Sequence, residues 1–244
     1  MPYFIVSLVI QLALVVHILR TGRNMTWVFI VLFFPLIGTL AYVIVELLPE
    51  FTQSRTARGA KRKLTKAINP DRDLQAASQN LARADTVQNA MALAEECLGK
   101  ERYEEARQLY ERCLRGLHAD DPHLLLGLAR SQFGLGDAAA TIATLDLLKE
   151  KNPKHKSPEG HLLYAKAQEQ QGNTDAAIHE YQALTRYYAG PEPVCRLASI
   201  LKSQGNSQEA RALFEKVVNE SKVAGKRYNS IHKEWVALAR RESS

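Results

Sequence analysis

The sequence has few cysteines and lacks the short motifs that mark common catalytic or metal sites. Its three cysteines form no Cys-x-x-Cys pair, so neither a structural zinc site nor a disulfide framework is indicated. It has no glycine-rich phosphate loop, no His-Glu-x-x-His and no serine in a nucleophile elbow. We therefore predict that the protein is not an enzyme, and we expect no cofactor and no metal. An enzyme with an unrecognised site is the alternative.

Charged residues are missing from two apolar runs near the N-terminus, residues 3–19 and 27–45. At about 1.5 Å per helical residue, the first run reaches about 26 Å, close to the thickness of a bilayer core. Trp27 and Tyr42 lie near the ends of the second run, where amphipathic rings suit the membrane interfaces. The runs predict a transmembrane helical hairpin within residues 1–52. A cleaved signal peptide and a pair of buried helices are the alternatives.

Three residues interrupt the apolar character of these predicted spans. Gln11 and His17 are polar, and we expect them to hydrogen-bond to the partner helix; a functional intramembrane role is the alternative. Pro35 removes one backbone hydrogen bond from the second span, which a membrane helix tolerates when its neighbours compensate.

Acidic residues are absent from residues 53–66, which form a basic collar. Such a cluster attracts anionic lipid headgroups at about 1 kcal/mol per residue, or it merely sets the membrane topology. The turn between the spans carries only Arg20 and Arg23, so both termini and the following domain are predicted to be cytoplasmic. Residues 71–84 predict a polar helix, either a spacer or a half-repeat, within a linker that ends at residue 85. The predicted lipid contacts are the six basic residues Arg55, Arg58, Lys61, Arg62, Lys63 and Lys66.

The second apolar run resembles a known membrane segment. It opens with Trp27, continues through a Pro35-x-x-Gly38 step and reaches Tyr42. These features are similar to the N-terminal two-helix membrane segment of bacterial cardiolipin synthases of the phospholipase D superfamily. The resemblance implies membrane anchorage in a bacterium. The His-x-Lys-x4-Asp motifs that carry that family's chemistry are absent, so no lipid-transferase activity is implied.

One pattern returns four times between residues 86 and 220. A small residue on one helix is followed by a turn, and then by a small residue and an aromatic or leucine on a second helix. Aligned on Glu101, Gly136, Gly172 and Gly205, the turns lie 35, 36 and 33 residues apart. This period is typical of a stacked helical solenoid, and prolines at the unit boundaries end the second helices. The fold class is therefore predicted to be all-α.

Each unit resembles a tetratricopeptide repeat (TPR), a helix-turn-helix. The first unit has Ala94 before its turn and Ala106 and Tyr110 after it; the third has Ala165, Ala177 and Tyr181. Residues 221–244 are predicted to form a capping helix. Its apolar stripe includes Ile231 and Trp235, where packing is favoured over a ligand platform for the tryptophan. Cys97 and Cys113 are interpreted as small buried hydrophobes, with a redox pair as the alternative.

The TPR resemblance implies a groove lined by the first helix of each unit. Arg130, Lys166 and Lys202 lie on these helices and predict a cationic ladder for an acidic peptide or a terminal carboxylate. Solvated charges in an ordinary groove are the alternative. The predicted partner-binding residues are Met91, Leu98, Leu126, Arg130, Phe133, Lys166 and Lys202.

The sequence as a whole predicts a membrane-anchored TPR scaffold at the cytoplasmic face of the bacterial inner membrane. Its expected partner is a protein or peptide, and no nucleic acid is expected. The alternative is a non-catalytic accessory of anionic phospholipid metabolism that acts through the hairpin and the basic collar. Anchoring raises the local concentration of a scaffold, so weak peptide contacts suffice.

Overall fold

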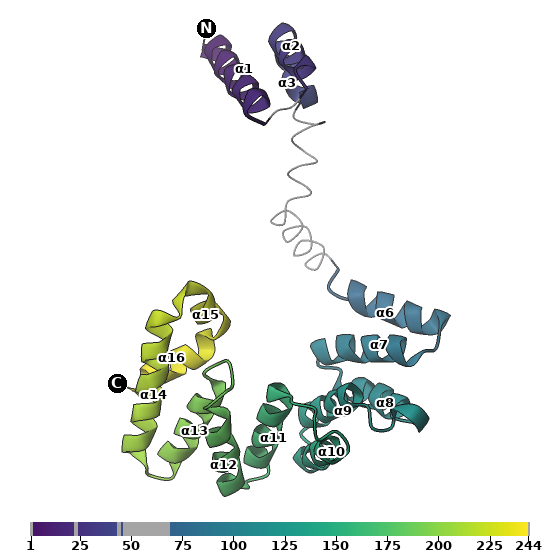
Figure 1. The fold of residues 1–244 in the computed structure, drawn as a ribbon, viewed down its shortest axis with the longest axis vertical. Helices are drawn as coiled ribbons and strands as arrows, with labels where there is room; N and C mark the ends of the chain where they lie inside the picture. The colour runs from purple at the N-terminus through teal and green to yellow at the C-terminus, as the bar shows by residue number, and fades with distance from the viewer. Residues whose placement is uncertain (1, 22–23, 43–44, 46–68, 244) are drawn as a thin grey trace. The chain divides into compact units, whose positions relative to one another are not determined.

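A computed structural model describes residues 2–21, 24–42, 45 and 69–243 as a series of helices and turns (Figure 1). The chain divides into two units, residues 1–72 and residues 73–244. The helical repeats confirm the predicted TPR-like architecture. The basic collar of residues 53–66 lies outside the described residues, so its predicted lipid contacts stay predictions.

The first unit contains α1 (Pro2–Thr21), α2 (Thr26–Phe33) and α3 (Pro35–Tyr42). Its small core consists of Ile18, Val31 and Tyr42, with Trp27 packed edge-to-face on the Tyr42 ring. The polar breaks contact neighbouring helices as predicted. Gln11 Nε2 donates to the Val31 carbonyl at 3.3 Å, and His17 Nδ1 lies 3.1 Å from the Tyr42 hydroxyl.

The second predicted span is not one continuous helix, which corrects the expectation for Pro35. Helix α2 ends before Phe34, whose φ of −123° and ψ of 77° are not helical. Proline lacks an N–H and also disfavours helical backbone in the residue before it, so the chain breaks there. After the break α3 packs against α2, and a Cβ on Gly38 would lie 2.2 Å from the Ile30 carbonyl oxygen. Across the described residues, no helix has both the length and the apolarity that crossing a membrane requires.

The second unit consists of helix pairs in which the two helices pack on each other and the second helix packs on the first helix of the following pair. Helix α6 (Arg72–Arg83) precedes them, and its Leu74 joins the core of the first pair, as a half-repeat does. The pairs are α7 (Val87–Gly99) with α8 (Tyr103–Cys113), α9 (Pro122–Gly134) with α10 (Ala138–Lys151), α11 (Pro158–Gln170) with α12 (Thr174–Leu184), and α13 (Glu192–Ser203) with α14 (Ser207–Val223).

The turn within each pair adopts one backbone conformation at the position on which the repeats align. Gly136, Gly172 and Gly205 have φ values of 82°, 80° and 88°. Glycine reaches this left-handed region without steric cost, whereas other residues are strained there. In the first pair the position is occupied by Glu101, with a φ of 59°. The period read from the sequence therefore marks a repeated left-handed turn.

Small residues let the helices of each pair approach closely. Ala94 and Ala106 are fully buried in the first pair, and Ala165 and Ala177 in the third. In the second pair Thr141 takes the place of an alanine, and its hydroxyl donates to the Asp137 carbonyl at 2.7 Å. This bond satisfies a polar group that burial would otherwise leave without a partner.

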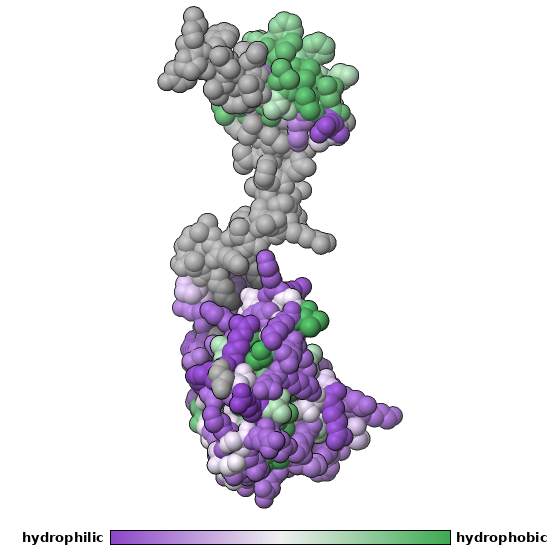
Figure 2. Space-filling model, turned by 90° about the vertical axis from the view of Figure 1, so that its left-hand side faces the viewer, coloured by the Kyte–Doolittle hydropathy of each residue, from purple (hydrophilic) through white to green (hydrophobic). Residues whose placement is uncertain are grey.

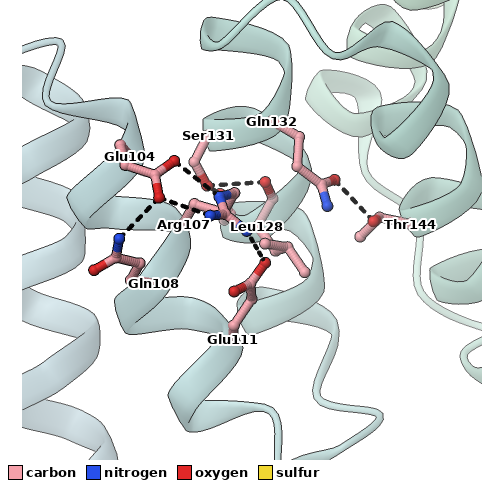
Figure 3. Close-up of polar contacts among 9 residues, drawn as sticks. Glu104, Arg107, Gln108, Glu111, Leu128, Ser131, Gln132 and Thr144 are labelled. Carbon is pink, nitrogen blue, oxygen red and sulfur yellow. Dashed lines mark hydrogen bonds and ion pairs between the residues drawn. The ribbon is translucent and has the colours of Figure 1, made fainter.

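Polar contacts also join neighbouring helices around the second pair (Figure 3). The Thr144 hydroxyl on α10 donates to the Gln132 side-chain oxygen on α9 at 2.8 Å, and both residues are buried. On the outer side of α8, Arg107 pairs with Glu104 and Glu111, each at 2.6 Å. The first contact fixes core packing, whereas the second lies on the solvent side.

The C-terminal cap differs from the predicted single helix. It contains the end of α14, α15 (Gly225–Ile231) and α16 (Lys233–Glu242), with a break at His232. Ile231 is exposed, so it does not belong to the apolar stripe, while Val236 and Ala239 are buried. Trp235 packs on the core of the fourth pair, as expected. All three cysteines are free and buried, and burial raises the pKa of each thiol.

Candidate functional site

The first helices α7, α9, α11 and α13 carry the predicted partner-binding residues, and we call their shared surface the first-helix face. Met91, Leu126 and Phe133 are half-buried at the edges of core clusters. Leu98 is buried in the core of the first pair, so it supports the surface from below. Arg130 and Lys202 are exposed, and Lys166 is half-buried. The residues of the predicted ladder therefore do reach the surface.

Each cation of the ladder already has a carboxylate partner on an adjacent element. Arg130 Nη1 lies 3.1 Å from Glu95 Oε1 on the previous first helix. Lys166 Nζ lies 3.4 Å from Glu192 Oε1 on α13, and it also sits 5.3 Å from the centre of the Phe133 ring. These pairs are neutral overall, so the face does not present a free row of positive charge.

The last cation of the ladder binds the cap. Lys202 Nζ lies 2.5 Å from Glu242 Oε2 at the end of α16. The contact joins the fourth helix pair to the C-terminal helix. The hydrogen bonds from Lys202 and Arg241 lower the pKa of Glu242, which is therefore ionised near neutral pH.

Two buried tyrosines hold acidic residues of the first-helix face in place. The Tyr110 hydroxyl donates to Glu95 at 2.7 Å, and the Tyr181 hydroxyl donates to Glu169 at 2.5 Å. Burial, together with the hydrogen bond to a carboxylate, raises the pKa of both tyrosines. Helices α8 and α12 thus each place a buried phenol where it positions a carboxylate on the face.

Arg196 connects the third pair, the fourth pair and the cap. Its guanidinium contacts Glu169 at 3.1 Å and Glu192 at 2.9 Å, and it lies 5.2 Å from the centre of the Trp235 ring. Since Glu192 also pairs with Lys166, the contacts form one continuous network over α11, α13 and α16. Two cations and two carboxylates therefore balance within it.

Sequence reasoning placed the cations but missed Glu192 and Glu242 as their partners. It also missed Arg196, which pairs with Glu169 and Glu192. One signal was available, because Glu192 and Arg196 lie four residues apart on one helix and such residues face each other. Another was the separation of Glu95 and Arg130, which is 35 residues and equals the first repeat spacing. No comparable signal marks Glu242. Among the described residues, no group of three or more His, Cys, Asp and Glu side chains is placed to hold a metal ion.

Comparisons with known proteins identify the repeats. Two tetratricopeptide-repeat family models match, one over residues 98–167 and the other over residues 162–224. No curated protein sequence matches the chain. The resemblance of residues 27–42 to the cardiolipin synthase segment gains no support from these matches and stays a prediction.

The chain was also compared with solved structures. The chain is similar to MamA MSR-1 C2, with 16% identity and a TM-score of 0.51 over 66% of this chain and 99% of that chain. A thermophilic TPR protein from Thermus thermophilus is 19% identical, with a TM-score of 0.37 over 65% of this chain and 97% of that one. At such identity, the similarity to MamA shows a shared fold alone.

Proposed function

Because residues 98–224 carry tetratricopeptide repeats, we propose that the chain is a scaffold that binds a protein partner on its first-helix face. The observation that carries this proposal is the row of ion pairs between neighbouring first helices, flanked by half-buried apolar side chains. An acidic partner segment binds there by replacing the carboxylate that each cation now holds.

The ease of this replacement differs along the face. The Arg130 and Glu95 side chains are 44% and 48% exposed, and exposed ion pairs contribute only about 0.2–1 kcal/mol. The Lys166 and Glu192 side chains are 25% and 20% exposed and belong to the Arg196 network. A partner carboxylate therefore engages Arg130 first, with Leu126 and Phe133 beside it as apolar contacts.

We further propose that residues 3–19 and 27–45 anchor the chain in the bacterial inner membrane, with both termini and the repeats in the cytoplasm. The support is the apolar surface of the first unit, whose visible face is largely hydrophobic in Figure 2, unlike that of the repeats. Contiguous exposed apolar surface is rare on soluble proteins and marks a contact with lipid or protein. The exposed residues include Leu12, Phe29, Leu32, Phe33, Ile37 and Leu40.

Proximity labelling from the C-terminus tests the scaffold. The test variant reverses the ladder as Arg130→Glu, Lys166→Glu and Lys202→Glu. The control reverses three exposed cations of α14, as Arg211→Glu, Lys216→Glu and Lys222→Glu, which gives the same change in net charge. We expect partner labelling to be lost only in the ladder variant, with circular dichroism showing that both variants are folded. Unchanged labelling in a folded ladder variant would contradict the proposed face.

Two further variants test the anchor. A reporter that is active only in the periplasm, fused after Ser244, is expected to stay inactive; activity would overturn the orientation. Exchange of residues 1–52 for an unrelated two-span anchor is expected to preserve the scaffold's function. Loss of function despite correct insertion would instead favour the accessory role in anionic phospholipid metabolism.

A further inference from the structure

A cavity of about 670 Å³ lies among α10, α11, α12 and the loop that joins α10 to α11. None of the ladder cations lines it. Its volume falls within the range of about 300–1,000 Å³ that is usual for ligand pockets. Leu145, Leu148, Pro153 and Tyr164 give it apolar walls. The cavity is therefore a candidate binding site that the sequence did not predict, and two second helices, α10 and α12, help to line it.

Two carboxylates line the cavity, and one of them, Glu180, contacts a histidine. Glu180 lies 2.5 Å from His161 Nε2, and the other ring nitrogen of His161 contacts the Tyr187 hydroxyl. Asp146 also lines the cavity, as does Tyr164, and burial raises the pKa of the Tyr164 hydroxyl.

The lysines that line the cavity are not engaged in this way. Lys149 stands on α10 and Lys156 in the following loop, and both line the cavity. Within the described ranges neither lysine forms an ion pair, whereas their neighbour Lys151 pairs with Glu150 at 3.0 Å. Two ammonium groups at the border of an apolar interior are therefore available to pair with a ligand.

We propose that this cavity is a second binding site, which takes an acidic peptide segment with an apolar side chain. The apolar side chain enters between Leu148 and Tyr164, and the neighbouring carboxylates pair with Lys149 and Lys156. Charge complementarity supports this occupant over a neutral one, because its carboxylates pair with the two lysines that form no ion pair among the described residues. The site is separate from the first-helix face and stands whether or not that face binds a partner.

Fluorescence anisotropy on the full chain tests the proposal with three blocked peptides. The probe is acetyl-Asp-Asp-Phe-Asp-Gly-amide carrying a fluorophore. One control peptide replaces each aspartate by asparagine, and the other replaces the phenylalanine by serine. We expect each control to bind about ten-fold more weakly or worse, because hydrogen bonds to charged groups and burial of an aromatic ring are each worth that much. Equal affinity for the three peptides, or no binding of the probe, would overturn the proposal.

Matched variants place the probe on the molecule. Lys149→Ser with Lys156→Ser removes the cavity cations, while Lys151→Ser with Lys154→Ser removes two lysines of the same region that do not line the cavity. We expect a loss of about ten-fold or more only in the first variant. An equal loss in the second variant would show attraction to general positive charge and would refute the site. A loss in Arg130→Gln would assign the probe to the first-helix face instead.

Discussion

Replacement of Gly127 by alanine tests how the helix pairs are packed. Gly127 lies on α9 and faces the ring of Tyr110 on α8, and an added Cβ would lie 2.3 Å from Tyr110 Cζ and 2.8 Å from its hydroxyl oxygen. The ring has no room to retreat, because Tyr110 is fully buried and its hydroxyl is bound to Glu95 at 2.7 Å. The substitution therefore forces the ring and its hydrogen bond to shift.

Two opposing terms set the effect of Gly127→Ala on the free energy of unfolding. Alanine is favoured over glycine in a helix by about 1 kcal/mol. Overpacking a core typically costs about 1–3 kcal/mol, and weakening a hydrogen bond to a charged group adds about 1.5–3 kcal/mol. The steric and hydrogen-bond costs together exceed the helical gain, so we expect a net destabilisation of roughly 1.5–5 kcal/mol.

Urea unfolding followed by circular dichroism measures the effect, with a second glycine and a second background as the controls. Gly99→Ala adds a methyl group with no neighbour within 4 Å, so we expect its midpoint to be unchanged or higher. In the background of Tyr110→Leu the ring is gone, so Gly127→Ala should lower the free energy of unfolding much less than it does in the wild-type background. Wild-type stability of Gly127→Ala, or an equal cost in both backgrounds, would refute the reasoning.

Three further predictions concern the turns, the thiols and the surface ion pairs. Glu101→Gly should stabilise the array by roughly 0.5–1 kcal/mol in the same urea assay, because it relieves left-handed strain. Burial raises the pKa of Cys195 to about 12, so a thiol reagent at pH 8 should label it only after unfolding. The same shift contributes stability that is present below the ordinary thiol pKa and is lost as pH rises toward about 12, measured as a falling alkaline midpoint. Hydrogen bonds from Arg107 and Gln108, drawn in Figure 3, lower the pKa of Glu104 to about 2. Arg107→Gln should nevertheless leave the midpoint unchanged, because the side chains of this network are exposed to solvent.

The repeats could be predicted because each rests on a local requirement that recurs in the sequence. A left-handed turn needs a glycine, and Gly136, Gly172 and Gly205 supply it at a spacing set by the size of one helix pair. Buried alanines on either side of the turn allow the two helices of a pair to approach each other closely. Glu101 departs from the glycine pattern but keeps the conformation, because its neighbours in the helix pair hold the backbone there.

The ends of the chain were less predictable because their helices are broken by particular contacts. The sequence predicts that Pro35 is tolerated within one span, whereas the helix breaks there. The return of α3 onto α2 depends on the absence of a side chain at Gly38. In the cap, α15 ends at Ile231, and the Tyr228 and His232 rings lie 4.5 Å apart across the break. Neither packing leaves a periodic signal in the sequence.

In the candidate site, the positions of the cations could be predicted from the sequence, but their carboxylate partners could not. The ladder positions follow from repeat periodicity, which puts Arg130, Lys166 and Lys202 on first helices. Their partners depend on the contacts between successive units. Glu192 starts the helix after the one that carries Lys166, and Glu242 ends the cap. A pattern of cations alone therefore overstated the positive charge that the face offers.

This difference in pairing predicts a difference in salt dependence between the two surfaces. A carboxylate that replaces Glu95 at Arg130 exchanges one ion pair for another, so the number of paired charges does not change. A carboxylate that binds Lys149 or Lys156 forms a new pair from exposed charges, and salt screens that attraction over a Debye length of about 8–10 Å. The affinity of the acidic probe for the cavity, titrated at low and at high salt, should therefore fall steeply as the salt concentration rises. In the variant lacking both cavity lysines, any residual binding at the first-helix face should change little with salt. A steep loss in that variant would mean that the ladder cations are free in solution, contrary to the ion pairs described above.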